Sequence, residues 1–328
     1  MVDQPALAIV VPAYKARFLG EALRSIAAQT DRRYRLYVCD DASPEDLEAI
    51  FRAAALPADA VFHRIEQNVG GRSLVESWRR SVALSGEPWV WLFSDDDTMH
   101  PECVASFYQA LQKDQDAFHV YRFNTLVINA GGQVIRIHPP NPELESVEEF
   151  IYHRLTVQRM SLAPEHIFRR EAYERRGGFV DMPFGLGSDD ATWINVVGED
   201  TLFRTIAGPR VCWRLSGSNI SSYSEGYTQK LLGLLTYAAW LYRRPGGGEL
   251  LTVDGRPTTF RRHDLIQSWF LGNLHRAPHF FPPSEVQTLV EAVARIGVPA
   301  KRALFYLLRS NFFFLLDRSR GMHKPAGS

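Results

Sequence analysis

The first hundred residues alternate between short apolar runs and segments whose apolar residues recur at helical spacing. The apolar runs predict strands over 7–11, 34–39, 60–65 and 89–93. The intervening segments predict helices over 18–29, over 72–85, and over 44–54 with Ser43 as its cap. In the helix over 18–29, the apolar face consists of Phe18, Leu19, Ala22, Leu23 and Ile26. This alternation is typical of α/β proteins, and we expect a right-handed, mostly parallel, doubly wound sheet with helices on both faces.

The pattern changes after residue 116. The segment 117–137 predicts strands joined by a turn at Gly131-Gly132, and the short runs 166–168 and 211–215 predict further strands. Helical spacing returns over 147–155 and 189–197, and from about residue 225 the chain reads as helical over 227–243, 261–274, 284–296 and 301–317. We therefore expect an α/β domain over 1–220, with halves at 1–115 and 116–220, and a helical C-terminal region over 221–328.

The composition is that of an ordinary globular protein. Of the 328 residues, 45% are hydrophobic and 23% charged, which excludes wholesale disorder. Lys plus Arg and Asp plus Glu both total 37, so a nucleic-acid binder that acts through a basic field is disfavoured. The three cysteines, Cys39, Cys103 and Cys212, are far apart and lack metal-ligand spacing, which indicates buried thiols in a reducing compartment rather than disulfides or a zinc site.

No part of the sequence has the pattern of a targeting or spanning segment. The first apolar run leads directly into Pro12, as expected for a buried strand rather than a signal peptide. No stretch reaches the ~20 apolar residues that a spanning helix needs. We expect a cytoplasmic protein that does not cross a membrane.

Acidic residues follow the fourth predicted strand, at the sheet edge where doubly wound folds bind ligands. The triplet Asp95-Asp96-Asp97 brings three carboxylates together, and such neighbours normally need a compensating cation. Mg²⁺ and Mn²⁺ take carboxylate ligands together with the phosphate oxygens of a nucleotide. The alternative is a solvated turn whose acids favour the N-terminus of a helix beginning at Pro101.

Two other predicted strands end in residues that suit a nucleotide. A carboxylate of Asp40-Asp41 could accept from a nucleobase N–H or a ribose hydroxyl, and the alternative is a cap cluster with Ser43. Tyr14 could stack on a base, although such a residue is more often ordinary packing. Both loops lie at the carboxyl ends of their strands, so we expect them on the same edge as the triplet.

A glycine-rich loop follows the third predicted strand. Gly70 and Gly71 permit a close approach of the backbone to a ligand, and Arg72 beside them could meet a phosphate. On its own this short motif is more often a simple turn. Its position gives it weight, because it comes from the same edge as the acids.

The order of five motifs resembles family two of the inverting glycosyltransferases, which have the GT-A fold. The motifs are Ile-Val-Val-Pro-Ala-Tyr at 9–14, Asp-Asp-Ala-Ser at 40–43, Asn-Val-Gly-Gly at 68–71, Phe-Ser-Asp-Asp-Asp at 93–97, and an acceptor-side set comprising Phe168-Arg169-Arg170, Gly177-Gly178-Phe179 and Gly187-Ser188-Asp189-Asp190-Ala191-Thr192-Trp193. The resemblance covers about residues 6–220, and the order of the motifs is specific whereas any one motif alone is not.

The resemblance implies a GT-A-like catalytic domain with a nucleotide-binding half at 1–115 and an acceptor half at 116–220. The implied nucleotide-binding residues are Pro12, Ala13, Tyr14, Asp41, Asn68, Gly70, Arg72, Asp95 and Asp96. For a divalent metal, Mn²⁺ or Mg²⁺, the favoured ligands are Asp95 and Asp97. The chain departs from the family pattern at Ser94, where many relatives carry an acid, and near Ser216, where many carry a histidine.

The pair Asp189-Asp190 matches the late acidic motif of this family, and the resemblance implies that Asp190 is the catalytic base. In that role the carboxylate takes the proton of an acceptor hydroxyl as the hydroxyl attacks the anomeric carbon from the far face, with inversion. The alternative assigns both acids to the cap and first turn of a helix.

The predicted function is transfer of a sugar from a nucleotide-sugar donor, with UDP favoured, to a glycan or lipid-linked acceptor in surface polysaccharide or glycoconjugate synthesis. One alternative is a sugar nucleotidyltransferase, which usually carries a glycine-rich basic loop where this chain has Pro12-Ala13-Tyr14-Lys15. The other is a non-catalytic nucleotide-sugar-binding assembly subunit, which the retained acidic positions, including Asp190, disfavour.

The segment 301–320 flanks an aromatic-rich apolar stripe with basic residues. Such a helix could lie in the interface of a membrane, at its inner face, as a peripheral contact. The alternative is that it packs on the catalytic domain or on a second copy of the chain, as in a homo-oligomer.

Overall fold

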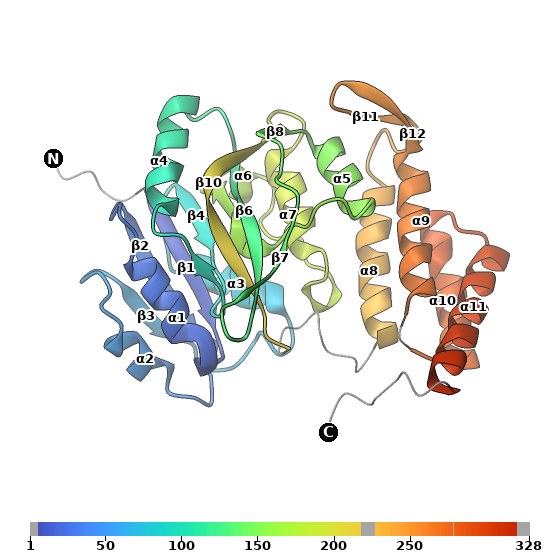
Figure 1. Cartoon of the computed structure of the whole chain (residues 1–328), viewed down its shortest axis with the longest axis horizontal. Coiled ribbons are helices and arrows are strands. Elements are labelled where there is room, and N and C mark those ends of the chain that lie inside the picture. The colour runs from blue at the N-terminus through green and yellow to red at the C-terminus, as the bar shows by residue number, and fades with distance from the viewer. Residues whose placement is uncertain (1–5, 218–226, 278, 320–328) are drawn as a thin grey trace. The chain divides into compact units, whose positions relative to one another are not determined.

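The computed structural model describes residues 6–217, 227–277 and 279–319, with side chains up to residue 316 (Figure 1). Contacts divide the chain into two compact units. Unit 1 comprises Met1–Phe150, Val157–Asp181 and Gly187–Tyr223. Unit 2 comprises Ile151–Thr156, Met182–Leu186 and Ser224–Ser328. The boundary expected at residue 220 lies outside the described residues.

Unit 2 therefore includes two short segments from the first 220 residues. One of them holds the turn η2 (Pro183–Gly185), which packs on helix α8 (Tyr227–Tyr242). The packing is close enough that a Cβ added to Gly233 of α8 would lie 2.9 Å from the backbone oxygen of Pro183.

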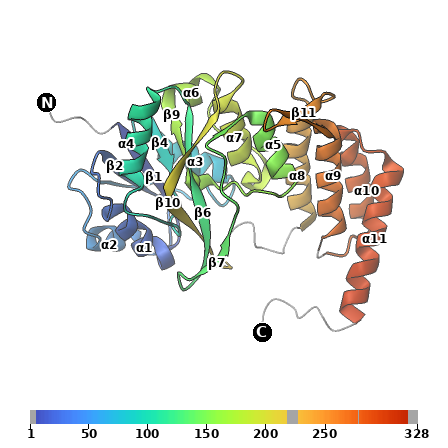
Figure 2. The ribbon, with the colours of Figure 1, turned by 45° about the horizontal axis from the view of Figure 1, so that its top comes forward.

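Unit 1 is built on a ten-stranded sheet with the path β3-β2-β1-β4-β9-β6-β10-β5, in which β7 pairs with β6 and β8 with β10 (Figures 1 and 2). The strands are β1 (Leu7–Ala13), β2 (Tyr34–Asp40), β3 (Val61–Arg64), β4 (Trp89–Leu92), β5 (Thr98–Met99), β6 (Val120–Asn129), β7 (Val134–Ile137), β8 (Leu144–Glu145), β9 (His166–Arg169) and β10 (Phe203–Leu215). Strands β1 to β4 are parallel to one another. Strand β9 is antiparallel to both β4 and β6, so β6 runs in the direction of β1 to β4, and β10 is parallel to β6. The expected mostly parallel, doubly wound sheet is confirmed.

Helices cover both faces of the sheet. Alternate residues of β1 point to opposite faces, and both sets are apolar, so each face must be covered. On one face Leu7, Ile9 and Val11 pack with buried residues of α1 (Ala16–Ala27), α2 (Leu47–Ala53) and α4 (Cys103–Asp114). Helix α3 (Leu74–Val82) contacts β1, β2 and β4, and α7 (Ser188–Val197) contacts β6 and β9. The buried residues of α1 are those predicted from helical spacing. Unit 1 also contains α6 (Arg170–Arg175) and the start of α5 (Val147–Leu155).

The cap predicted for the second helix is wrong. Helix α2 begins at Leu47, and the side chain of Asp46 accepts from the backbone N of Ala49 at 3.0 Å. The Ser43 hydroxyl instead donates to the backbone oxygen of Tyr14 at 2.7 Å. Ser43 is therefore a link between the loops that follow β1 and β2.

Strand β10 is longer than the predicted segment 211–215. It begins at Phe203 and has a register irregularity between Ile206 and Arg210, where Gly208 and Pro209 interrupt the apolar pattern. Such an interruption hides a strand from a reading based on periodicity. The hairpin of β6 and β7, with its turn at Gly131-Gly132, is confirmed.

Unit 2 contains the predicted C-terminal helices, as α8, α9 (Arg262–His275), α10 (Pro283–Ala292) and α11 (Ala300–Ser319). It also contains a hairpin of β11 (Leu250–Val253) and β12 (Arg256–Arg261) that the sequence analysis missed. Its turn is Asp254-Gly255, a pair typical of tight hairpins, with both residues at positive φ. Among the residues described, no helix is both long and apolar enough to cross a membrane.

Candidate active site

The loop after β1 is held by the first carboxylate of the acid triplet. Oδ2 of Asp95 accepts from the backbone N of Tyr14 at 2.9 Å and of Lys15 at 3.1 Å. Lys15 is the cap residue of α1, so this carboxylate binds the N-terminus of that helix, where negative charge is favoured. Burial raises the pKa of Asp95 above its ordinary value, and the hydrogen bonds from the two backbone amides offset only part of that rise. The contact holds Tyr14 at the carboxyl edge of the sheet, directly after Pro12 and Ala13 of β1, with 42% of Tyr14 exposed.

Asp41 fixes the glycine-rich loop. Its Oδ1 accepts from the backbone N of Val69 at 2.9 Å, and its Oδ2 accepts from Gly70 N at 2.7 Å and Asn68 Nδ2 at 3.1 Å. A Cβ added to Gly70 would lie 2.5 Å from Oδ2 of Asp41, so this contact requires glycine. The structure therefore brings together the predicted residues Asp41, Asn68 and Gly70. Arg72 follows in the same loop as an exposed residue whose backbone N donates to the oxygen of Val69 at 2.9 Å.

Asp40 has a different task from Asp41. Its Oδ1 accepts from the backbone N of Ser43 at 2.8 Å, and its Oδ2 pairs with Arg64. Arg64 also donates to the backbone oxygen of Ser43 at 2.8 Å. Asp40 therefore shapes the turn after β2 through a partner on β3, whereas Asp41 reaches the loop that follows β3.

The last carboxylate of the triplet is tied to the end of β10. Oδ1 of Asp97 accepts from the backbone N of Arg214 at 2.7 Å, while Oδ2 is buried and has no hydrogen-bond partner among the described residues. Burial first, and then the charge of Asp96, raise the pKa of Asp97 well above its ordinary value. Asp97 is fully buried, so in this structure it lies behind the surface of the site.

Arg214 is a site residue that the sequence analysis did not identify. Its guanidinium is buried over the ring of Phe18, 4.4 Å from the ring centroid. Its Nε donates to the backbone oxygen of Asp96 at 2.8 Å, and its Nη2 to Oε2 of Glu21 at 2.6 Å. Arg214 lies two residues before Ser216, near which the resemblance places a histidine in many relatives. In the sequence, Arg214 could have been noticed as a charged residue among the apolar residues of a predicted strand.

Asp96 presents the third carboxylate of the triplet. It is partly exposed, and no other described residue donates a hydrogen bond to its side chain. Burial, followed by the charge of Asp95, raises the pKa of Asp96 to about 6. Within the described part of the chain no three His, Cys, Asp or Glu side chains form a metal cluster. A carboxylate whose ionised form is disfavoured by burial and by a neighbouring carboxylate still fits a divalent cation that takes its other ligands from phosphate oxygens.

Asp189 and Asp190 lie in the first turn of α7, after Gly187, which has a positive φ of 78°. Helix α7 ends at Val197 and β10 begins at Phe203, so the C-terminus of the helix lies near the start of that strand. Because β10 runs toward the carboxyl edge of the sheet, the N-terminus of α7 points to the same edge as Asp96. This topology places Asp189 and Asp190 at the same edge of the sheet as the triplet Asp95–Asp97.

Comparisons with known proteins agree with this arrangement. The family model described as glycosyl transferase family 2 matches residues 8–173. A search of curated protein sequences found no match. Among solved structures, the chain is similar to S. aureus TarS 1–349 in complex with UDP-GlcNAc, with a TM-score of 0.67 and 11% identity over 96% of this chain and 92% of that one.

A second similar structure is the mannosyltransferase PcManGT from Pyrobaculum calidifontis in complex with GDP-Man and Mn²⁺. The TM-score is 0.52, with 17% identity over 97% of this chain and 89% of that one. At these low identities, the two structural similarities show a common fold only. The family model, which matches half of the chain, shows the family. The chain belongs to glycosyl transferase family 2 and is a glycosyltransferase with the GT-A fold.

Proposed function

We propose that this glycosyltransferase moves a sugar from a nucleotide-sugar donor, with a UDP-sugar favoured, to an acceptor hydroxyl with inversion of the anomeric centre. The observation that carries the proposal is the set of loops at the carboxyl edge of the sheet. There an exposed Tyr14, the loop bound by Asp41, and the Asp96 carboxylate follow neighbouring parallel strands. The similar structures were solved with UDP-GlcNAc, UDP and GDP-Man, which supports a nucleotide sugar as the donor.

The nucleoside would lie between the loops after β1 and β3. The Tyr14 ring offers an exposed face for the base, and base–aromatic stacking is a common source of affinity. The Asp41 carboxylate accepts three hydrogen bonds from the loop after β3, two from the backbone N of Val69 and Gly70 and one from Asn68 Nδ2, and an ionised carboxylate can accept about four. The remaining site on Oδ1 would accept a ring N–H of the base.

Asp96 would hold the divalent metal, Mn²⁺ or Mg²⁺, together with the oxygens of the diphosphate. When bound, such a cation stabilises the negative charge that develops on the leaving nucleoside diphosphate. The sequence analysis favoured Asp95 and Asp97 as the ligands. The hydrogen bonds of Asp95 to the β1–α1 loop and the burial of Asp97 instead favour Asp96.

Asp190 would act as the base from a buried position in the first turn of α7, with the partly exposed Asp189 beside it. As the acceptor oxygen forms its bond to the anomeric carbon, its proton passes to the Asp190 carboxylate. The bond between that carbon and the phosphate oxygen breaks, and the nucleoside diphosphate leaves on the opposite face. Attack in line with the leaving group gives inversion, and the charge carried by Asp190 is neutralised in the same step.

The proposed cellular role is synthesis of a surface polysaccharide or another glycoconjugate, from a glycan or lipid-linked acceptor, in the cytoplasm. Cys39 and Cys103 are buried free thiols, which supports a reducing compartment, whereas Cys212, also predicted to be buried, is partly exposed. Nucleic acid is not a proposed partner, because the net charge of the chain is zero.

The products released from defined donors test this proposal. The protein is incubated with UDP-, GDP- and dTDP-sugars and a panel of glycan and lipid-linked hydroxyl acceptors, and nucleoside diphosphate release is measured together with the anomeric configuration by NMR. We expect release from one donor class with an inverted product. Asp190→Asn should lower that rate by ~10²–10⁴-fold while calorimetry shows unchanged nucleotide affinity.

Two results would overturn the proposal. Pyrophosphate formation from a nucleoside triphosphate and a sugar phosphate would indicate the nucleotidyltransferase alternative. Nucleotide binding without transfer to any acceptor, and without donor hydrolysis, would indicate the non-catalytic subunit.

A further inference from the structure

Helix α11 has an apolar face that unit 2 does not cover. Its buried residues Ala303, Leu307 and Ser310 share one side, which packs on α9 and α10. The opposite side carries large apolar residues that are about half exposed: Leu304, Phe305, Leu308, Phe312, Phe313 and Leu315, with Phe305 and Phe312 at 58%. A cluster of exposed apolar residues of this kind marks an interaction site more often than chance exposure.

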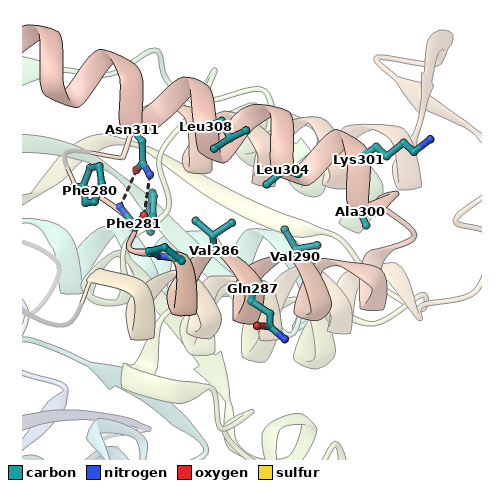
Figure 3. Close-up of a pocket in the computed structure, with 11 residues that line it drawn as sticks. Phe280, Phe281, Val286, Gln287, Val290, Ala300, Lys301, Leu304, Leu308 and Asn311 are labelled. Atoms are coloured by element: carbon teal, nitrogen blue, oxygen red, sulfur yellow. Dashed lines mark hydrogen bonds between the residues drawn. The ribbon is translucent and has the colours of Figure 1, made fainter.

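A groove between α10 and α11 extends this face (Figure 3). Val286 and Val290 of α10 line it opposite Leu304 and Leu308 of α11. At one end the side chain of Asn311 donates to and accepts from the backbone of Phe281, both at 2.8 Å. These two hydrogen bonds fix the spacing of the helices, so the groove is preformed.

The charge along this helix is mainly basic. The sequence over 300–319 holds Lys301, Arg302, Arg309 and Arg318 against a single acid, Asp317, and Arg309 lies over the ring of Phe313 at 5.6 Å. Among the acids of α10, Glu285 accepts from Thr228 and His279, and Glu291 accepts from Gln287. The apolar surface is therefore accompanied by basic residues, a combination that complements an anionic surface.

A second copy of the chain is a poorer match for this face. A two-fold contact places the same patch on both partners. Pairing α11 with itself would bring the basic residues of both copies together, and the single acid of the helix, Asp317, does not compensate four basic residues over 300–319. An antiparallel pairing would place the two Arg309 side chains close to each other near the middle of the helix.

We propose that the outward face of α11, together with the α10–α11 groove, docks on the surface of an anionic phospholipid bilayer. The helix would lie in the plane of the interface, with its apolar side chains among the acyl chains and its lysine and arginines at the headgroups. The inference concerns unit 2 alone and does not rest on the donor or mechanism proposed above.

Co-sedimentation of the full chain with vesicles tests this proposal. We expect binding to vesicles of phosphatidylcholine and phosphatidylglycerol in equal amounts, little binding to phosphatidylcholine alone, and weaker binding as salt is raised. The double variant Phe305→Ser and Phe312→Ser should lose binding. The matched control Ile135→Ser and Ile137→Ser, on exposed residues of β7 at 52% and 65%, should keep it.

A second variant tests the charges without touching apolar surface. Arg302→Gln with Arg309→Gln should weaken binding to the anionic vesicles by about fivefold for each charge removed. Equal binding by wild type and both double variants would overturn the proposal, as would failure of the wild type to bind anionic vesicles. Loss of a dimer in Phe305→Ser and Phe312→Ser by sedimentation velocity, with no vesicle binding by the wild type, would assign the face to a second copy.

Discussion

The backbone amide of Arg214 donates a 2.7 Å hydrogen bond to Oδ1 of Asp97, joining the end of β10 to the acid triplet that follows β4. The guanidinium of the same residue bonds the backbone oxygen of Asp96. Two distant segments of unit 1 thus set the position of the carboxylate that we assign to the metal. The triplet is oriented by backbone and cation contacts rather than by solvent.

Arg214→Met should destabilise unit 1 and displace Asp96. The substitution removes the donors to the part-buried carbonyls of Asp96 and Ala130, and each group left unpaired costs up to about 1–3 kcal/mol. Chemical denaturation measures the loss. The control Glu21→Gln removes only the partner at the half-exposed end and should cost roughly 0–1 kcal/mol. Equal effects of the two variants would show that the carbonyl contacts contribute nothing.

Asp97→Asn should make the ligand-free protein more stable near neutral pH. The pKa of the Asp97 carboxyl is raised well above its ordinary value by burial and by Asp96, so its charged form disfavours folding. The amide keeps an oxygen to accept from the Arg214 amide, and we expect a higher free energy of unfolding for the variant.

The gain from Asp97→Asn should depend on pH with a definite sign. It is largest near neutral pH, shrinks as the pH falls towards about 4, and is absent below that, where the wild-type carboxyl is protonated both folded and unfolded. Melting temperatures across this range, in EDTA, measure it. Asp59→Asn, which removes an exposed charge, should show no such gain. A variant less stable than wild type at every pH would contradict the assignment.

Gly70→Ala should weaken donor binding by disturbing the loop that Asp41 holds. The new Cβ would lie 2.5 Å from Oδ2 of Asp41, so the carboxylate or the loop must shift, at a cost of about 1–3 kcal/mol. Isothermal titration with UDP should show roughly tenfold lower affinity. Gly86→Ala, at a glycine with open space around it, should match wild type. Tight binding by both variants would exclude this loop from the donor site.

Tyr14→Ala should lower the affinity for UDP without lowering stability. The residue is 42% exposed, and its loop is held through backbone amides that the substitution keeps. Loss of stacking corresponds to roughly a tenfold rise in Kd. Tyr14→Phe retains the ring and should bind like wild type in the same titration. If the alanine variant binds equally well, the base does not stack on this residue.

Much of the fold could be predicted from the sequence, because strand and helix periods are local properties. The buried face of α1, the positions of the first four strands in the sequence, and the placement of Tyr14, Asp41 and the triplet at strand ends all follow from periodicity. The structure agrees with these predictions. The expected helices of the C-terminal region are also present as α8 to α11.

The separate tasks of the three adjacent aspartates could not be predicted. Asp95 bonds amides at the end of β1 and Asp97 an amide of β10, and these partners lie more than 75 residues away in sequence, at separations of 81, 80 and 117. Asp96 differs from its neighbours only because those long-range bonds leave it facing outward. For the same reason Arg214 could be identified only once β10 was placed beside the triplet.

Binding of nucleoside diphosphates tests the central claim most directly. The melting temperature is measured with UDP, GDP and dTDP, each with and without Mn²⁺ or Mg²⁺, for wild type and Asp96→Ala. A ligand specific to the folded state adds ~2.7 kcal/mol of stability at a hundred times its Kd. We predict a shift with one nucleotide, UDP first, that the metal enlarges and that Asp96→Ala removes. No shift at saturating concentrations of any nucleotide, with or without metal, would contradict a donor site at the carboxyl edge of this sheet.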